Sequence, residues 1–281
     1  MASADHPVLI VGGDGLIGRA LHESYRAAGV PCLATSRRAG QHPRLDLAAL
    51  PETWELGDSY RAAFLCAGRT KLADCEAYPA ETALINVTRT IELARKLGER
   101  GAFIVFLSTN LVFDGNKAFP TVDDTPNPTT AYGRQKAEAE KILRELGERV
   151  AIVRLTKVVH PAMSLLLDWA GALRRREVIH PYSDMVFSPI PLEYVVRALQ
   201  SIASRRTEGV IHLSAETDIS YESLATSLAE LLNAVPDLVQ PRLAPAPAPR
   251  FGTLRMRPED AAILKPPAAA ETIRELLSTV K

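Results

Sequence analysis

A short apolar run followed by closely spaced glycines is the feature of this 281-residue chain that most restricts its fold. Val8-Leu9-Ile10-Val11 has the uninterrupted hydrophobicity of a buried parallel strand. Residues 12–18 (GGDGLIG) come next and lead into a helical pattern that ends at Gly29. A strand, a glycine turn and a helix in this order can cradle a phosphate, because the turn lets the ligand approach free N–H groups at a helix N-terminus. A tight turn without a ligand is the alternative.

Strand-like and helix-like segments alternate from residue 7 to residue 155, which predicts an α/β fold with a doubly wound parallel sheet of Rossmann type. After the first strand, we expect strands at residues 31–35, 45–47, 62–66, 103–107 and 150–155, and a long helix at 79–100. Further on we expect helices near 164–175, 192–205, 221–232 and 271–280, strands near 178–180, 185–187 and 210–213, and an extended Pro/Ala-rich connector at 236–249.

Composition excludes several classes of function. Lys+Arg and Asp+Glu are 33 each, so no overall field attracts nucleic acid or a membrane surface. No apolar stretch approaches the roughly 20 residues that span a bilayer, and the N-terminus lacks the pattern of a signal peptide. Three cysteines without metal-like spacing indicate reduced thiols in a cytoplasmic protein. We find no carboxylate set that requires a metal.

The second expected strand ends in Ser36-Arg37-Arg38. A dinucleotide site specific for NAD places Asp or Glu there to hold the ribose 2′-hydroxyl, whereas Arg favours a 2′-phosphate. Two arginines without an acid therefore predict NADP(H), and a solvated loop is the alternative. Asp46, at the end of the third expected strand, is placed to meet an adenine amino group.

A second group of polar residues is predicted at the carboxyl edge of the sheet, where open α/β folds bind ligands. The fifth expected strand delivers Ser108-Thr109-Asn110 to that edge. Tyr132 and Lys136 lie four residues apart on a strong helix former, and therefore on one face. A lysine ammonium a few ångströms away favours the phenolate, so we expect Lys136 to lower the pKa of Tyr132 and to enable proton transfer. Taken alone, the pair favours a solvated helix face, and the glycine turn at the start of the chain changes that interpretation.

These features in this order make the chain resemble an extended short-chain dehydrogenase/reductase, and most closely the branch that includes dTDP-4-dehydrorhamnose reductase. The motifs that carry the resemblance are VGGDGLIGRAL, RLDL, FLCAG, INVTRTIELA, LSTNLVFDG, NPTTAYGRQKAEAE, VRLTKVV, DMVFSPIPLEYVVRAL, GVIHLS and RMRPEDAAIL. The resemblance implies an NADP-binding domain at residues 1–155 and a smaller substrate-binding cap at 156–281, partly woven back into the sheet near 185–205.

The resemblance also implies an NAD(P)-dependent oxidoreductase acting on CH–OH groups, with NADP(H) preferred and NAD(H) possible. Its activity would be NADPH-dependent reduction of a keto group on a nucleotide-linked 4-keto-6-deoxysugar, in carbohydrate biosynthesis, by a possible homodimer. Tyr132 would donate the proton, Lys136 would hold the nicotinamide ribose, and Thr109 would bind the substrate oxygen. The implied cofactor contacts are Gly12, Gly15, Leu16, Ile17, Gly18, Arg37, Arg38, Asp46, Leu47, Cys66, Ala67, Gly68, Asn86, Ser108, Tyr132 and Lys136. Lys157 and Arg257 are weaker candidates for substrate contact.

The chain departs from this branch at two places. Asn110-Leu111 stands where the family usually has Asp-Tyr, and Thr156-Lys157 comes after the sixth strand where a Trp is usual. The proposed catalytic residues are kept while two aromatic substrate contacts are lost. This combination favours intact redox chemistry on a different keto substrate. Two alternatives stay open: a sugar-nucleotide epimerase or dehydratase that keeps NAD bound, and a non-catalytic NADP-binding regulatory subunit, since one relative serves methionine adenosyltransferase in that way.

Overall fold

The computed structural model describes residues 6–38, 43–245 and 251–280. The chain divides into two compact units, and each is described by itself. The first comprises Met1–Phe113, Thr125–Arg154 and Val195–Ile211, and the second comprises Asp114–Asp124, Leu155–Tyr194 and His212–Lys281. The segment that returns to the first unit is therefore 195–211, whereas the sequence placed it near 185–205.

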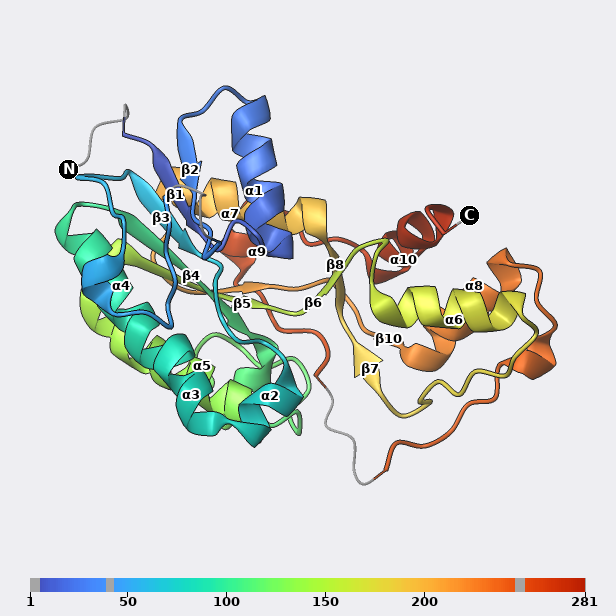
Figure 1. Ribbon diagram of the computed structural model, residues 1–281. Coiled ribbons are helices and arrows are strands. Elements are labelled where there is room, and N and C mark those ends of the chain that lie inside the picture. The colour runs from blue at the N-terminus through green and yellow to red at the C-terminus, as the bar shows by residue number, and fades with distance from the viewer. Residues whose placement is uncertain (1–5, 39–42, 246–250, 281) are drawn as a thin grey trace. The chain divides into compact units, whose positions relative to one another are not determined.

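A six-stranded sheet forms the centre of the first unit, in the order β2-β1-β3-β4-β5-β9 (Figure 1). Its strands are β1 (Val8–Val11), β2 (Cys32–Ala34), β3 (Ala62–Leu65), β4 (Phe103–Thr109), β5 (Val150–Leu155) and β9 (Gly209–Leu213). β1 pairs in parallel with β2 on one side and with β3 on the other. The strand order reverses at β1, so the carboxyl ends of β1, β2 and β3 surround a crevice suited to a ligand.

Helices cover both faces of this sheet (Figure 1). On one face lie α1 (Leu16–Ala27) and α7 (Leu192–Arg205), which a hydrogen bond from Gln200 to Ser24 connects. On the other lie α5 (Ala131–Leu143) and the nearly continuous helix made of α3 (Pro79–Ala83), η2 (Leu84–Arg89) and α4 (Thr90–Glu99). The expected helix at 79–100 is thus confirmed, but η2, which carries Asn86, is π-helical.

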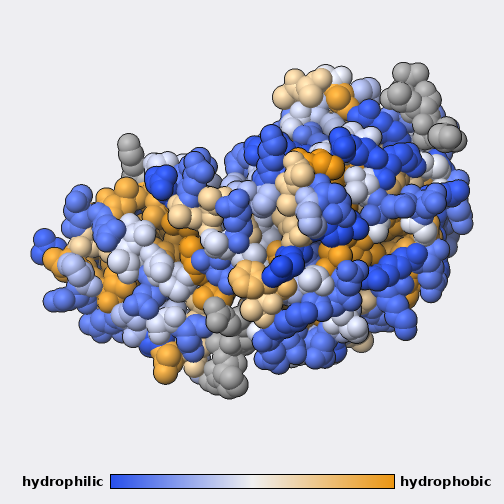
Figure 2. Space-filling view, turned by 180° about the vertical axis from the view of Figure 1, so that it is seen from behind, coloured by the Kyte–Doolittle hydropathy of each residue, from blue (hydrophilic) through white to orange (hydrophobic). Residues whose placement is uncertain are grey.

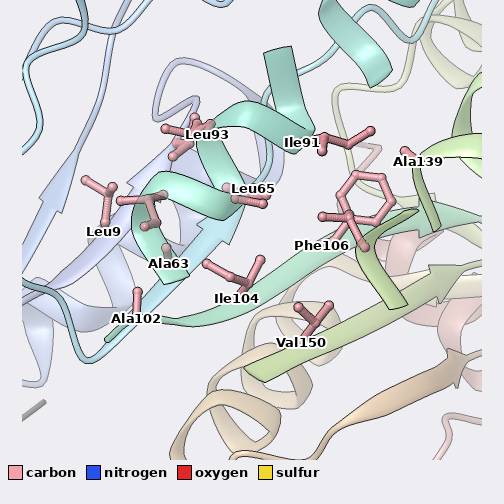
Figure 3. Packing of buried hydrophobic residues seen from close by; sticks show 14 of the residues in the cluster. Leu9, Ala63, Leu65, Ile91, Leu93, Ala102, Ile104, Phe106, Ala139 and Val150 are labelled. Carbon is pink, nitrogen blue, oxygen red and sulfur yellow. The ribbon is translucent and has the colours of Figure 1, made fainter. Parts of the chain in front are cut away.

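The core explains the uninterrupted apolar runs. Every residue of β1, β3, β4 and β5 is buried, as expected for strands covered on both faces. Figure 3 shows side chains of the sheet packed against those of α4 and α5. They include Leu9, Ala63, Leu65, Ile104 and Phe106 from the strands, with Ile91 and Leu93 from α4 and Ala139 from α5.

Two of the expected strands are wrong. Residues 45–47 make no ladder beyond a single bridge between Ser36 and Arg44, because the Asp46 carboxylate accepts the Ala48 N–H and the Asp46 carbonyl accepts the Trp54 indole N–H. Residues 178–180 likewise make one bridge, between Ile179 and Val239.

The remaining elements of the first unit are short: η1 (Pro51–Thr53), α2 (Leu72–Ala77), η3 (Asn110–Val112) and η4 (Arg144–Arg149).

The second unit packs α6 (Ser164–Arg174), α8 (Tyr221–Leu231) and α10 (Ala269–Ser278) around an apolar cluster that includes Leu166, Leu228 and Leu276. Two small sheets belong to it, β10-β7 and β6-β8. Its other elements are β6 (Lys157–Val159), β7 (Val186–Phe187), β8 (Pro189–Pro191), β10 (Ile219–Ser220), η5 (Pro236–Leu238) and α9 (Pro258–Leu264). η5 and the bridge at Val239 lie within the expected connector at 236–249, whose last residues, 246–249, fall outside the described residues.

The surface is mixed in polarity. Figure 2 shows hydrophilic residues over much of the face it draws, with apolar residues between them. Exposed apolar side chains occur in both units, among them Tyr78, Val235 and Leu243. In the described ranges, no helix combines the length and hydrophobicity required to cross a bilayer.

Candidate active site

The glycine turn after β1 is pressed against the ends of its two neighbouring strands. Gly12 has φ +90°, and a Cβ there would lie 2.9 Å from the backbone nitrogen of Ala67, just after β3. A Cβ on Gly13 would lie 2.7 Å from the Cβ of Ala34 in β2. The Gly12 N–H donates to the Thr35 hydroxyl at 3.1 Å, which fixes the turn. Only glycine fits these two positions, so backbone rather than side chains forms the floor of the crevice.

α1 starts from this turn with its first N–H groups uncapped. Gly15 is the N-cap residue, and no side chain caps the helix. The N–H groups of the first turn, including those of Leu16 and Ile17, are donors that a helix cannot satisfy internally, and they carry the positive end of the helix dipole. They form the kind of site that binds a phosphate.

Gly18 has a packing role in the glycine turn. It is buried, and a Cβ there would overlap the carbonyl oxygen of Gly12. Gly18 therefore lets α1 pack closely on the turn, and it does not belong to the cleft lining.

We expect Gly18→Ala to destabilise the protein by about 1–3 kcal/mol, because the added methyl group meets backbone that cannot move aside. Thermal unfolding measures the loss. The matched control is Gly98→Ala near the end of α4, where an added Cβ meets nothing within 4 Å. That change should leave the melting temperature unchanged or raise it, since Ala favours a helix over Gly by up to about 1 kcal/mol. Equal melting temperatures for the two variants would contradict the packing role.

A cleft of about 370 Å³ lies over the glycine turn, entirely within the first unit. The predicted residues that line it are Gly12, Gly15, Arg37, Asp46, Leu47, Cys66, Ala67 and Gly68. It is also lined by Asp14, Thr35, Ser36, Leu45, Ala48, Arg69 and Ile85, which the sequence analysis did not assign to a site. The lining does not include the other predicted cofactor contacts, which are Leu16, Ile17, Gly18, Arg38, Asn86, Ser108, Tyr132 and Lys136.

The two arginines after β2 differ in their surroundings. Arg37 is exposed and lines the cleft. Arg38 is exposed too, but its Nε lies 3.9 Å from the Asp14 carboxylate, which also accepts a 2.7 Å hydrogen bond from the Ser36 hydroxyl. Arg37 is therefore the better candidate to hold an added phosphate, and Arg38 compensates the acid in the turn.

Asn86 supports the cleft from behind. Its amide oxygen accepts the Arg69 N–H at 2.8 Å, and its amide nitrogen donates to the Arg69 carbonyl and to Gln135, each at 2.8 Å. Gln135 lies on α5 and donates in turn to Thr82 at 2.9 Å. The loop after β3 is thereby fixed to the helix that carries Tyr132 and Lys136.

Thr109, Tyr132 and Lys136 lie on adjacent elements of the first unit. β4 ends at Thr109, whose hydroxyl accepts the Leu111 N–H at 3.2 Å and caps η3. Thr130 caps α5 by accepting the Gly133 N–H at 3.0 Å, so Tyr132 falls in the first turn of the helix. A Cβ on Gly133 would overlap the Leu111 carbonyl, so α5 approaches η3 as closely as two backbones can.

Lys136 is buried beside Tyr132. Its Nζ donates to the Leu107 carbonyl at 2.8 Å and lies 4.4 Å from the Phe106 ring centroid and 5.9 Å from that of Tyr132. Burial lowers the pKa of Lys136 to about 8, against an opposing influence from Glu140. The predicted lowering of the Tyr132 pKa is wrong for this structure. Burial raises the pKa of Tyr132, because it removes water from the phenolate, and the nearby Cys75 thiol adds to the rise.

This lysine makes stability depend on pH in a definite direction. The folded protein releases the Lys136 proton near pH 8, whereas the ordinary pKa is 10.5. Between these values the unfolded chain has more protons bound at Lys136, so the contribution of Lys136 to the free energy of unfolding should rise with pH from 8 to 10. Burial raises the pKa of Cys66 to about 12, which gives an opposite slope in the wild type and in Lys136→Met alike. The difference in free energy of unfolding between the two proteins, from chemical denaturation at each pH, should therefore change in favour of the wild type as pH rises. Parallel pH curves for the two proteins would show that Lys136 titrates normally.

Ser108 was expected at the cofactor, but its hydroxyl points to a buried acid. Its Oγ donates to a carboxylate oxygen of Glu140 on α5 at 2.5 Å. Arg154 of β5 holds the same carboxylate, with Nη2 2.7 Å from Oε2. Sequence reasoning missed this cluster, although a charged residue inside the apolar strand VAIVRL is a signal that a buried partner is needed.

The two weaker substrate candidates belong to the second unit. Lys157 is exposed on β6. Arg257 pairs with Asp260 at 2.8 Å and with Glu259 at 3.7 Å at the start of α9. In the same unit His212 is buried, and its Nδ1 lies 3.0 Å from the Arg255 carbonyl, in keeping with a structural role. Within the described ranges, no group of three or more His, Cys, Asp or Glu side chains is arranged so that it could hold a metal ion.

Together, the sheet, its helices and the glycine cleft define a Rossmann-type α/β protein. The family model described as RmlD substrate binding domain matches residues 6–281, and the chain belongs to this family.

Similarity to individual proteins is more distant. The chain is 26% identical over 255 residues to dTDP-4-keto-6-deoxy-D-glucose reductase of Streptomyces niveus, covering 89% of this chain and 85% of that protein. It is 23% identical over 241 residues to methionine adenosyltransferase 2 subunit beta of Xenopus tropicalis, covering 80% of this chain and 72% of that protein. Among solved structures, dTDP-4-dehydrorhamnose reductase of Bacillus anthracis in complex with NADP has a TM-score of 0.83 at 19% identity, covering 99% of each chain. That structural likeness bears on the fold alone.

Proposed function

We propose that this protein is an NADPH-dependent reductase of a keto group carried on a nucleotide-linked 4-keto-6-deoxysugar. The observation that carries the proposal is the buried Tyr132–Lys136 pair next to the end of β4, in the same unit as the glycine cleft. A similar reductase from Streptomyces niveus and membership of the RmlD substrate binding domain family support it.

The residues of the cleft fit a dinucleotide phosphate. Gly12 keeps a side chain out of the cleft, Gly13 lets the turn pack against β2, and the uncapped start of α1 offers N–H donors to a pyrophosphate. Arg37 at the cleft would hold a 2′-phosphate, for which a guanidinium fork is well suited. Cys66, Ala67 and Gly68 are small enough to leave room for a ring beside β3. NADP(H) bound there would supply hydride to a carbonyl carbon.

Tyr132 would protonate the carbonyl oxygen as the hydride arrives. Because burial raises its pKa, Tyr132 keeps its proton throughout the neutral range and is available as an acid. A developing alkoxide is a stronger base than the phenolate, so the transfer is favourable once the carbon has been reduced. Lys136 would steady the phenolate that remains, and Thr109 would orient the oxygen. Such proton transfer contributes a factor of about 10²–10⁴ in rate.

The test is turnover. Purified protein should oxidise NADPH when supplied with dTDP-, UDP- or GDP-linked 4-keto-6-deoxysugars, measured by loss of the NADPH absorbance and by identification of the reduced sugar. Failure to reduce any of these, with NADPH bound, would reject the proposal. Tightly bound NAD in the purified protein would favour the epimerase or dehydratase alternative.

A non-catalytic regulatory subunit is the second candidate. The similarity to methionine adenosyltransferase 2 subunit beta favours it, as does the replacement of the family's usual Asp-Tyr by Asn110-Leu111. NADP binding without turnover, together with a stable complex with a methionine adenosyltransferase, would establish it instead.

A further inference from the structure

Next to Lys136 lies a buried charged cluster formed by Ser108, Glu140 and Arg154. Arg154 has 0% of its surface exposed and Glu140 has 1%. The Arg154 Nε donates to the two carboxylate oxygens of Glu140 at 3.1 and 3.2 Å, and Nη2 donates at 2.7 Å. The Arg154 guanidinium also lies 5.0 Å from the Phe113 ring centroid. A fully buried ion pair gains little net stability over apolar residues of the same size, so stability alone does not account for the Glu140–Arg154 pair.

The cluster shares two elements with the proposed active site. Leu107 and Ser108 are consecutive at the end of β4, and Lys136 and Glu140 are one turn apart on α5. Lys136 donates to the Leu107 carbonyl at 2.8 Å, and Ser108 donates to Glu140 at 2.5 Å. Two adjacent hydrogen bonds thus fix α5 in register with the strand that ends at Thr109.

Three titratable groups act on the pKa of Lys136, and Glu140 has the largest effect of the three. Glu140 faces it from its own helix, while Cys66 after β3 and Cys75 on α2 are the other titratable groups that affect it. Burial disfavours the ammonium, and Glu140 is the largest influence that opposes burial. Arg154 and Ser108 hold the Glu140 carboxylate in place, since both donate hydrogen bonds to it.

We propose that Glu140, held by Ser108 and Arg154, is a positioning residue that keeps Lys136 charged and in register with Tyr132 at neutral pH. Glu140 itself touches neither cofactor nor substrate in this proposal. The inference rests on the proposed function, because it concerns the same proton-transfer site.

The test compares Glu140→Gln with Glu138→Gln, an exposed acid on the same helix. Lysine labelled with ¹³C at Cε, with the Lys136 signal assigned from Lys136→Met, reports the titration of Lys136 directly by NMR. We expect Glu140→Gln to lower the Lys136 pKa by about one to three units, as loss of a nearby opposite charge does. Glu138→Gln should leave it unchanged. If a charged Lys136 is required for turnover, kcat should fall as Lys136 loses its proton. This fall should occur at lower pH in Glu140→Gln than in the wild type.

The double variant Glu140→Gln/Arg154→Met gives a second, graded outcome. It removes the Arg154 guanidinium charge as well, so the Lys136 titration should lie between those of the wild type and Glu140→Gln. Because it removes both members of the buried ion pair, it also decides the matter if Glu140→Gln alone does not fold. A Lys136 titration identical to that of the wild type in the folded variants would overturn the inference. The NMR titration needs no substrate, so an inactive wild type would count against the proposed function only.

Discussion

Replacing Tyr132 by Phe should abolish reduction while NADPH still binds. The change removes one buried hydroxyl and keeps the ring, so the packing around α5 is preserved. Without the phenol, the carbonyl oxygen has no positioned acid, and kcat should fall by about 10²–10⁴-fold. Stopped-flow or steady-state loss of NADPH absorbance measures kcat, and fluorescence titration measures the Kd for NADPH.

Tyr25→Phe is the matched control. Tyr25 is also buried in the first unit, on α1, and burial raises its pKa to about 12. Its ring packs against that of Phe64 in β3, with centroids 5.9 Å apart, and it is not one of the proposed catalytic residues, so turnover should survive its loss. Wild-type rates from Tyr132→Phe would remove Tyr132 from the mechanism, and equal losses in both variants would indicate general damage to the core.

Replacing Arg37 by Ala should weaken NADPH binding about 10–100-fold, because one charged hydrogen-bonding group is worth about 1.5–3 kcal/mol. Binding of NADH, which lacks the 2′-phosphate, should hardly change. The protein should therefore lose most of its preference for NADPH over NADH. Isothermal titration calorimetry with each dinucleotide measures both affinities.

Arg38→Ala is the control for Arg37→Ala. The structure pairs Arg38 with Asp14, and Arg38 does not line the cleft. Its replacement should lower the affinities for NADPH and NADH to a similar, smaller extent, by leaving the Asp14 charge uncompensated near the pyrophosphate. Selective loss of NADPH affinity in Arg38→Ala alone would reverse the two assignments.

Patterns that depend on burial could be predicted from the sequence. The apolar runs of β1, β3, β4 and β5 identify strands covered on both faces, and the spacing of Tyr132 and Lys136 places them on one helix. The alternation in Leu45-Asp46-Leu47 correctly indicates that the two leucines are buried, yet it does not make a strand. Side chains of Asp46 and Trp54 take the backbone groups that a ladder would need.

Features that depend on contacts between distant residues could not be predicted from local pattern. Ser108 looks like a site residue because it ends a strand beside Thr109, and only the fold shows that its hydroxyl is engaged by Glu140. Arg37 and Arg38 are equivalent in the sequence, and Asp14 distinguishes them in space. The sign of the Tyr132 pKa shift depends on how completely water is excluded from the ring hydroxyl, which spacing along a helix does not reveal.

The π-helical segment η2 has a consequence for redesign. A π turn holds one more residue than an α turn, and Asn86 sits within it. Converting this stretch to an ideal α-helix with the same number of residues would rotate the helix before it by about 100° relative to the helix after it. Asn86 would then lose either Arg69 or Gln135, which it now bridges. An optimisation aimed at regular helices would therefore strengthen this segment locally and detach the wall of the cleft from α5, the helix that carries Tyr132 and Lys136.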